Sequence, residues 1–124
     1  MHCMVAGKAS NEQEARSVSQ LRKGVLEYCV LALLRDGPRY GVELLDVLAG
    51  SPVMATSQGT LYPLLSRLRR SGLADTFLME SASGPSRRYY QLTDQGRQAL
   101  EEFAGHWPGF RDAVDRFLVP GAES

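Results

Sequence analysis

The sequence contains little of what a disulfide framework or a metal site requires. Its 124 residues include two cysteines and two histidines. Cys3 lies near the start of the chain and Cys29 lies inside an apolar run, so we expect reduced thiols and no disulfide framework. His2 and His106 are far apart and no Cys-x-x-Cys spacing occurs, which makes a metal or thiol sensor the weaker alternative. We therefore expect no metal and no cofactor.

Long hydrophobic runs and enzyme motifs are also lacking. No stretch approaches the roughly 18 apolar residues that a membrane span needs, and the N-terminus lacks the basic flank of a signal peptide. A cytoplasmic protein is expected. The sequence shows no Ser/His/Asp order, phosphate-cradling glycine loop or clustered carboxylate pair. An enzyme is therefore not predicted.

Net charge is zero, but the charges are unevenly distributed along the chain. Residues 50–92 carry five arginines against two acidic residues, whereas residues 93–124 carry three arginines against six acidic residues. The middle segment is therefore basic enough to meet phosphate groups while the C-terminal segment keeps the molecule neutral. The alternative is chance clustering of ordinary surface charge.

The hydrophobic pattern predicts three helices, a hairpin and a final helix. Residues 1–18 are mixed and polar, which indicates a flexible arm or a short optional helix. The later elements follow from apolar periodicity and from glycine and proline breaks. In chain order they are a helix over 21–35, a helix over 40–49, a helix that starts at Thr56 or Ser57 and is closed by Gly72, strands over 74–79 and 87–92 around a loop over 81–86, and a helix capped by Thr93.

This order of elements is typical of a winged helix-turn-helix. The expected fold class is mainly α with a small β-hairpin, together with a long C-terminal dimerisation helix. We expect a flexible N-terminal arm over 1–18, a winged helix-turn-helix DNA-binding domain over 19–92 and a dimerisation helix over 93–120.

The third predicted helix has an unusual outward face. Its inward stripe consists of Leu61, Leu64, Leu65 and Leu68, at i, i+3, i+4 and i+7. Its outward half consists of Gly59, Tyr62, Pro63, Ser66 and Arg70, with Thr60 and Arg67 at the flanks. A purely solvated helix would carry Glu, Lys and Gln instead, so we expect this face to enter a DNA major groove. The alternative for Tyr62 and Pro63 is packing under the wing or against another helix.

Two arginines lie beside the Gly-Pro tip of the predicted wing. Arg87 and Arg88 are neighbours in a strand, so their side chains are expected on opposite faces. At least one of them is then expected to reach a phosphate or the minor groove. The alternative is a solvated pair.

Three ordered motifs resemble those of the PadR family of transcriptional regulators. Gly59-Thr60-Leu61-Tyr62-Pro63 resembles the family's recognition-helix signature, and Tyr40-Gly41-Val42-Glu43-Leu44 resembles its turn into the second helix. Arg87 to Arg97 resembles its wing strand and following helix start, while Val42 and the short tail depart from the common pattern. The resemblance implies a DNA-binding dimer, usually a repressor, that is often released by a small aromatic effector or a stress signal.

The predicted DNA-binding residues combine the outward face, the turn and the wing. Gln58 is expected to pair with adenine and Thr60 to contact a thymine methyl group, with Tyr62 beside them. The full set is Tyr40, Ser57, Gln58, Thr60, Tyr62, Arg67, Arg70, Arg87 and Arg88. The alternative function is a winged-helix adaptor that binds a protein partner without DNA, which the zero net charge favours.

The last predicted helix carries a stripe spaced 3, 4, 3, 4, 3, which is typical of a seam between paired helices. Its members are Leu100, Phe103, Trp107, Phe110, Val114 and Phe117. We expect the near end to cover the first helix and the far end to contact a second subunit of a homodimer. Pro108 predicts a bend, and a small aromatic effector is expected near Trp107, Phe103 and Phe110. The alternative for Trp107 is a simple core or interface side chain.

Overall fold

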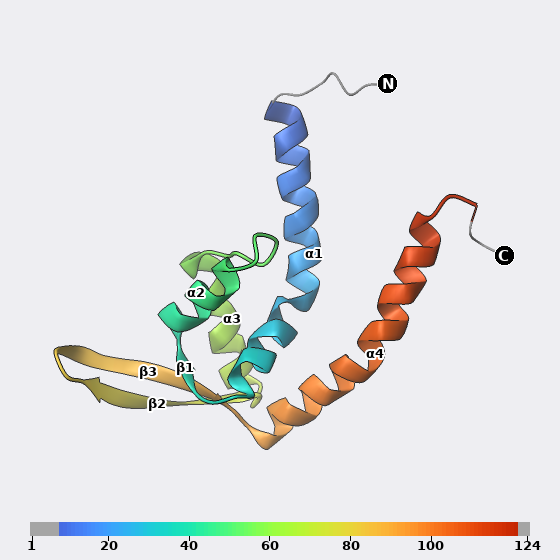
Figure 1. Ribbon diagram of the computed structural model, residues 1–124. Helices are drawn as coiled ribbons and strands as arrows, with labels where there is room; N and C mark the ends of the chain where they lie inside the picture. The colour runs from blue at the N-terminus through green and yellow to red at the C-terminus, as the bar shows by residue number, and fades with distance from the viewer. Residues whose placement is uncertain (1–7, 122–124) are drawn as a thin grey trace.

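The computed structural model describes residues 8–121, with side chains from residue 16 onward. The chain forms four α-helices and three strands within this range (Figure 1). In chain order they are α1 (Lys8–Leu34), β1 (Arg39–Tyr40), α2 (Gly41–Ala49), α3 (Gln58–Arg70), β2 (Ala74–Ser81), β3 (Gly84–Leu92) and α4 (Asp94–Leu118).

The three strands form one small antiparallel sheet in the order β1-β3-β2. Figure 1 shows the β2–β3 hairpin projecting away from the helices as a wing, while α4 leads away from the other end of the sheet. The predicted fold class, a helix-rich winged helix-turn-helix with a small hairpin, is confirmed.

One leucine-rich core holds α1, α2 and α3 together. Leu31 of α1, Leu44 of α2, and Leu61 and Leu65 of α3 are fully buried. Burial of each such side chain contributes about 1.5–3 kcal/mol to folding. The predicted inward stripe of the third helix is therefore confirmed, and its burial fixes which face of α3 turns outward.

Thr93 joins the end of α3 to the start of α4. Its hydroxyl accepts a hydrogen bond from the backbone N–H of Gly96 at 2.9 Å and donates one to the carbonyl oxygen of Gly72 at 2.7 Å. Gly72 has a φ of +81°, a conformation that favours glycine. The predicted cap at Thr93 and the predicted helix stop at Gly72 are both present.

Helix α1 begins earlier than the sequence analysis predicts. The expected flexible arm ends at residue 18, but α1 is continuous from Lys8 to Leu34. Residues 8–18 contain no proline or glycine, and Glu, Gln, Ala and Arg in this stretch all favour helix. The sequence leaves a flexible arm and a short helix as alternatives for this segment, and the structure has a helix over residues 8–18. Residues 1–7 of the arm lie outside the described residues.

The wing also differs from the prediction. The expected loop over 81–86 is wrong, because β2 runs to Ser81 and β3 starts at Gly84. The register shifts between Met79 and Ser81, where one residue of β2 faces two of β3. The bulge therefore lies in β3 and includes Pro85, which has no N–H to give to a ladder. Strand β1, which pairs Arg39 with Tyr90 and Tyr40 with Tyr89, was not predicted because two residues carry no periodicity.

Candidate nucleic-acid interface

Helix α3 presents a polar face whose position is set by its buried leucines. Leu61, Leu64, Leu65 and Leu68 are at most 6% exposed. No acidic residue lies in the first turn of α3, so nothing there offsets the positive end of the helix dipole. The exposed residues of the helix are Gln58, Gly59, Thr60, Tyr62, Pro63, Ser66, Arg67, Arg69 and Arg70.

Of the two N-cap candidates that the sequence gives for α3, Thr56 and Ser57, it is Ser57 that occupies the N-cap position. Its carbonyl oxygen accepts the N–H groups of Thr60 and Leu61 at 3.1 and 2.9 Å. Its hydroxyl instead lies 3.4 Å from the hydroxyl of Thr60 and makes no capping bond to the backbone. Ser57, Gln58 and Thr60 are all exposed, so the start of α3 offers a group of polar side chains to a partner.

Tyr62 leans from α3 onto the first residue of α2. Gly41 is buried there, and a Cβ atom placed on it would lie 2.5 Å from Cε1 of Tyr62. Tyr62 nevertheless remains 36% exposed. The two interpretations of Tyr62, packing and outward contact, are therefore compatible with one position.

The two wing arginines lie on opposite faces of the hairpin, as predicted for strand neighbours. Tyr89 pairs with both Tyr40 and Phe77, so Arg87, two residues away, shares their face. Arg87 lies over the Tyr40 ring, with Cζ 4.7 Å from the centroid. Arg88, on the other face, donates from Nη1 to Oγ1 of Thr76 at 2.9 Å.

Four of the predicted DNA-binding residues meet around one hollow, which we call the wing groove. It has a volume of about 420 Å³ and lies between the start of α2, α3 and the wing. Its lining consists of two arginines, three tyrosines, a glycine and a valine. They are Arg87, Arg88, Tyr40, Tyr62, Tyr90, Gly41 and Val42. Positive charge, hydroxyl groups and aromatic rings are the chemistry that contacts phosphates and base edges.

The remaining α3 residues do not face this groove. Thr60 and Arg67 turn toward α1 and line a second hollow of about 290 Å³, the flank groove. Arg67 is 3.6 Å from a carboxylate oxygen of Glu27, and its side chain is 56% exposed. Arg70 is exposed at the last turn of the helix and lines neither groove.

Sequence reasoning missed three residues beside these grooves. Arg22 and Lys23 of α1 line the flank groove, and Arg22 donates from Nη1 to the carbonyl oxygen of Val53 at 2.8 Å. Gly41 lies in the wing groove under Tyr62. The adjacent basic pair at 22–23 is a visible signal, but only the packing of α1 beside α3 makes it part of this surface.

Along α4, the predicted dimerisation stripe is buried at its start and exposed at its end. Leu100 is 5% exposed, Trp107 37% and Phe117 83%. Phe103 stacks on Tyr28 of α1, with centroids 4.1 Å apart and planes at 2°. The near end of the stripe thus covers the first helix. Helix α4 continues through Pro108 as one helix.

An apolar hollow of about 480 Å³, the interhelical groove, runs between α1 and α4. Leu21 and Val25 are the large apolar residues of its α1 side, while Phe103, Trp107, Phe110 and Val114 form most of its α4 side. The three aromatic rings continue the stack that starts at Tyr28, with successive centroids 5.7 and 6.4 Å apart. In the single chain this groove leaves Phe110 65% exposed.

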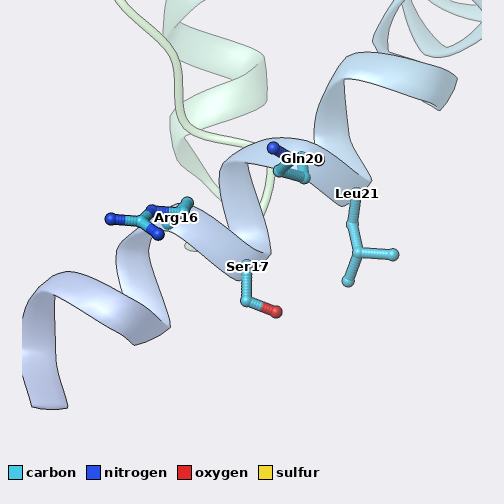
Figure 2. A pocket seen from close by; sticks show the side chains of 4 residues that line it. All are labelled: Arg16, Ser17, Gln20 and Leu21. Atoms are coloured by element: carbon cyan, nitrogen blue, oxygen red, sulfur yellow. The ribbon is translucent and has the colours of Figure 1, made fainter.

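A shallower hollow lies on α1 alone. Figure 2 shows its four lining side chains, Arg16, Ser17, Gln20 and Leu21, which all project from consecutive turns of this helix. Leu21 is 72% exposed and also lines the interhelical groove. The hollow is therefore an uncovered helix face that adjoins the interhelical groove.

Of the residues behind the thiol and metal alternatives, His2 and Cys3 lie outside the described residues. Cys29 is a free thiol in α1, and partial burial raises its pKa. Between residues 8 and 121, no three metal-ligating side chains gather in one place. Over the same residues, none of the helices combines the length and the apolar character that a membrane crossing requires.

Comparisons with known proteins agree with this geometry. The family model described as the transcriptional regulator PadR-like family matches residues 30–102. A padr family transcriptional regulator from Eggerthella lenta is 34% identical, with a TM-score of 0.81 over 91% of this chain and 98% of that one. A PadR-like transcriptional regulator from Bacillus cereus is 38% identical, with a TM-score of 0.71 over 81% of this chain and 97% of that one.

Proposed function

The chain belongs to the PadR-like family of transcriptional regulators, and from this membership we propose that it is a repressor that binds a specific DNA operator as a homodimer. The observation that carries the proposal is the wing groove, where Tyr40, Tyr62, Arg87 and Arg88 meet beside the exposed face of α3. Operator binding assigns the protein to the cytoplasm.

Base readout is assigned to the start of α3. Gln58, Thr60 and Tyr62 are exposed on a helix whose N-terminal end carries no acidic residue. Gln suits adenine and Thr suits a thymine methyl group, so these side chains read base edges in the major groove. Ser57 precedes them at the N-cap of α3, and Tyr40 lies beside Tyr62 in the wing groove.

Phosphate contacts are assigned to the arginines. Arg87 and Arg88 lie on the wing and Arg70 lies exposed at the end of α3, and each is proposed to contact a phosphate group of the DNA backbone. Arg67 contributes from the flank groove, where its side chain remains 56% exposed despite its ion pair. These contacts position the protein, and the α3 residues supply specificity.

The homodimer is proposed from the far half of α4. Phe110, Val114 and Phe117 are 65%, 41% and 83% exposed in the single chain. An apolar stripe of this length on a helix is usually covered by a partner helix. Pairing α4, with help from Leu21 on α1, gives a two-fold dimer whose recognition helices enter major grooves about 34 Å apart on a pseudopalindromic site.

A small planar aromatic molecule is proposed as the effector, bound in the interhelical groove. The groove is apolar and contains three stacked rings, Phe103, Trp107 and Phe110. A ligand there releases DNA only by as much as it prefers the arrangement of subunits that does not fit the operator.

Two observations favour a second candidate, a winged-helix adaptor for a protein partner. Net charge is zero, and the wing carries exposed apolar side chains, Leu78 at 63% and Met79 at 48%. The two functions differ in salt dependence, since binding through phosphates weakens steeply with salt. Selection of bound duplexes from a random pool, followed by a salt titration of the selected duplex, distinguishes them.

A further inference from the structure

Gly41 and Tyr62 come from the two helices of the helix-turn-helix and meet without a side chain between them. A Cβ atom on Gly41 would lie 2.5 Å from Cε1, 2.6 Å from Oη and 2.8 Å from Cζ of Tyr62. These are its three nearest atoms, and all belong to the Tyr62 side chain. Any larger residue at position 41 therefore displaces the Tyr62 ring.

The backbone itself does not require glycine at this position. The glycines with positive φ are Gly37, Gly72 and Gly121 among the described residues, and Gly41 is not one of them. Position 41 is the first residue of α2, where the conformation is open to other residues. What the absent side chain provides is therefore space for Tyr62.

We propose that Gly41 is a positioning residue for DNA readout: it lets the Tyr62 ring lie flush on α2 and so sets where the hydroxyl of Tyr62 is presented to a base. The inference rests on the proposed DNA-binding function. Tyr62, Arg87 and Arg88 line the same wing groove, so a shift of the ring changes the shape offered to the major groove. Gly41 touches no base in this account and acts only through Tyr62.

Tyr62 can yield without unfolding the chain, which separates this role from a structural one. Tyr62 is 36% exposed and its ring stands at the far end of the side chain, so the ring can swing toward solvent when a methyl group takes its place. Gly96 differs from Gly41, because a Cβ there would clash with the backbone carbonyl oxygen of Leu73. A backbone atom cannot rotate away as a side-chain ring can. Gly96→Ala is thus expected to destabilise the fold, whereas Gly41→Ala is expected to change DNA readout.

The test uses the full chain and a duplex obtained by selection from a random pool. Gly41→Ala, Tyr62→Ala and the double variant are compared with Gly105→Ala, a helix glycine with nothing within 4 Å of an added Cβ. Gly41→Ala is expected to lose about tenfold or more in affinity for the selected duplex, the size of one lost base contact. Its melting temperature and its salt slope stay near those of the wild type, and Gly105→Ala binds like the wild type.

The double variant carries the decisive comparison. With the ring already removed, Gly41→Ala has nothing to displace, so the double variant is expected to bind within about twofold of Tyr62→Ala. If the two losses multiply instead, or if Gly41→Ala binds within twofold of the wild type, the inference is wrong. Should Gly41→Ala alone fail to fold, the double variant must fold and bind like Tyr62→Ala, and an unfolded double variant overturns the inference.

A measurement without DNA separates the failure of this inference from that of the proposed function. The α protons of Gly41 lie against an aromatic ring, so their NMR resonances are expected to shift on Tyr62→Ala. Shifted resonances with operator binding unaffected by Gly41→Ala overturn the positioning role alone. A wild-type protein that selects no duplex overturns the proposed function, and the positioning role with it.

Discussion

The guanidinium of Arg87 lies over the ring of Tyr40, with Cζ 4.7 Å from the ring centroid. Tyr40 in turn meets Tyr89 edge-on at 5.3 Å, and Tyr89 stacks on Phe77 at 5.5 Å. Arg87 of the wing therefore packs directly against Tyr40, the residue before α2. The rings of Tyr89 and Phe77 continue this packing on the same face of the sheet. This contact links the orientation of the wing to that of α2.

Replacing the Tyr40 ring, over which Arg87 lies, is expected to weaken DNA binding without removing a charge. Tyr40→Leu keeps an apolar side chain but loses the cation–π contact, worth about 0.5–1 kcal/mol at an exposed site. Affinity for the selected duplex should fall about two- to fivefold, while the slope of binding against salt stays constant. Fluorescence anisotropy measures both, with Val47→Ala on the exposed side of α2 as control. Wild-type affinity in Tyr40→Leu would show that the ring does not orient Arg87.

Removing the wing arginines is expected to change the salt slope itself. Arg87→Ala or Arg88→Ala should weaken binding to all duplexes similarly and reduce the slope by about one unit for each lost phosphate contact. Arg97→Ala, an exposed arginine on α4 outside both grooves, controls for the loss of a positive charge. An unchanged slope in both wing variants removes the wing from the interface.

Charge on the far end of α4 is expected to give folded monomers. Phe117 is 83% exposed and Phe110 65% exposed in the single chain, so glutamate at either position costs the fold little. In the proposed dimer the same carboxylate would be buried without a partner, which is strongly unfavourable. Light scattering at micromolar concentration should report a dimer for the wild type and monomers for Phe110→Glu and Phe117→Glu.

Arg116→Glu is the matched control for the dimer prediction. It reverses an exposed charge that lies about 100° around the helix from Phe117 and outside the apolar stripe, so it should leave the dimer intact. A monomeric wild type at that concentration, or dimers in both phenylalanine variants, would contradict the α4 interface.

Trp107 provides an intrinsic reporter for the proposed effector. It is the single tryptophan of the chain and lies between Phe103 and Phe110 in the interhelical groove. Phenolic acids and planar cationic dyes that release DNA are expected to quench its fluorescence, because flat rings stack on it. If no releasing compound quenches it and Trp107→Ala stays inducible, the effector binds elsewhere.

Thr93 is expected to govern stability rather than readout. Thr93→Ala loses the bond from Gly96 N–H and the bond to the Gly72 carbonyl, so the free energy of unfolding should fall by about 0.5–2 kcal/mol. Thr93→Ser keeps the hydroxyl and should retain most of the stability. Urea denaturation measures both, and equal losses in the two variants would show that the hydroxyl is not what matters.

Features that depend on local pattern could be predicted from the sequence. The leucine stripe of α3, the cap at Thr93 and the stop at Gly72 each follow from spacing or from the chemistry of one residue. The extension of α1 to Lys8 was missed because a polar helix face resembles a flexible segment in composition. Strand β1 and the added length of the hairpin depend on pairing with β3, which no single strand encodes.

For the candidate site, the sequence identified the residue types but not their neighbours. Tyr40, Tyr62, Arg87 and Arg88 were each predicted, and the fold brings them to one groove. Their specific contacts, the Tyr62 ring on Gly41 and Arg87 over Tyr40, arise where α2, α3 and the wing converge. Residues far apart in sequence make these contacts, so periodicity within one element does not reveal them.

Binding of the wild-type protein to a selected duplex, titrated across salt concentrations beside a scrambled duplex, is the most direct test of sequence-specific DNA binding. Sequence-specific binding through several arginines predicts that the logarithm of affinity falls linearly with the logarithm of salt, by about 0.9 units for each phosphate contact. At a fixed physiological salt concentration, the selected duplex should bind at least about a thousandfold more tightly than the scrambled one. Equal affinity for both duplexes, or affinity that does not change with salt, would contradict a DNA-binding regulator.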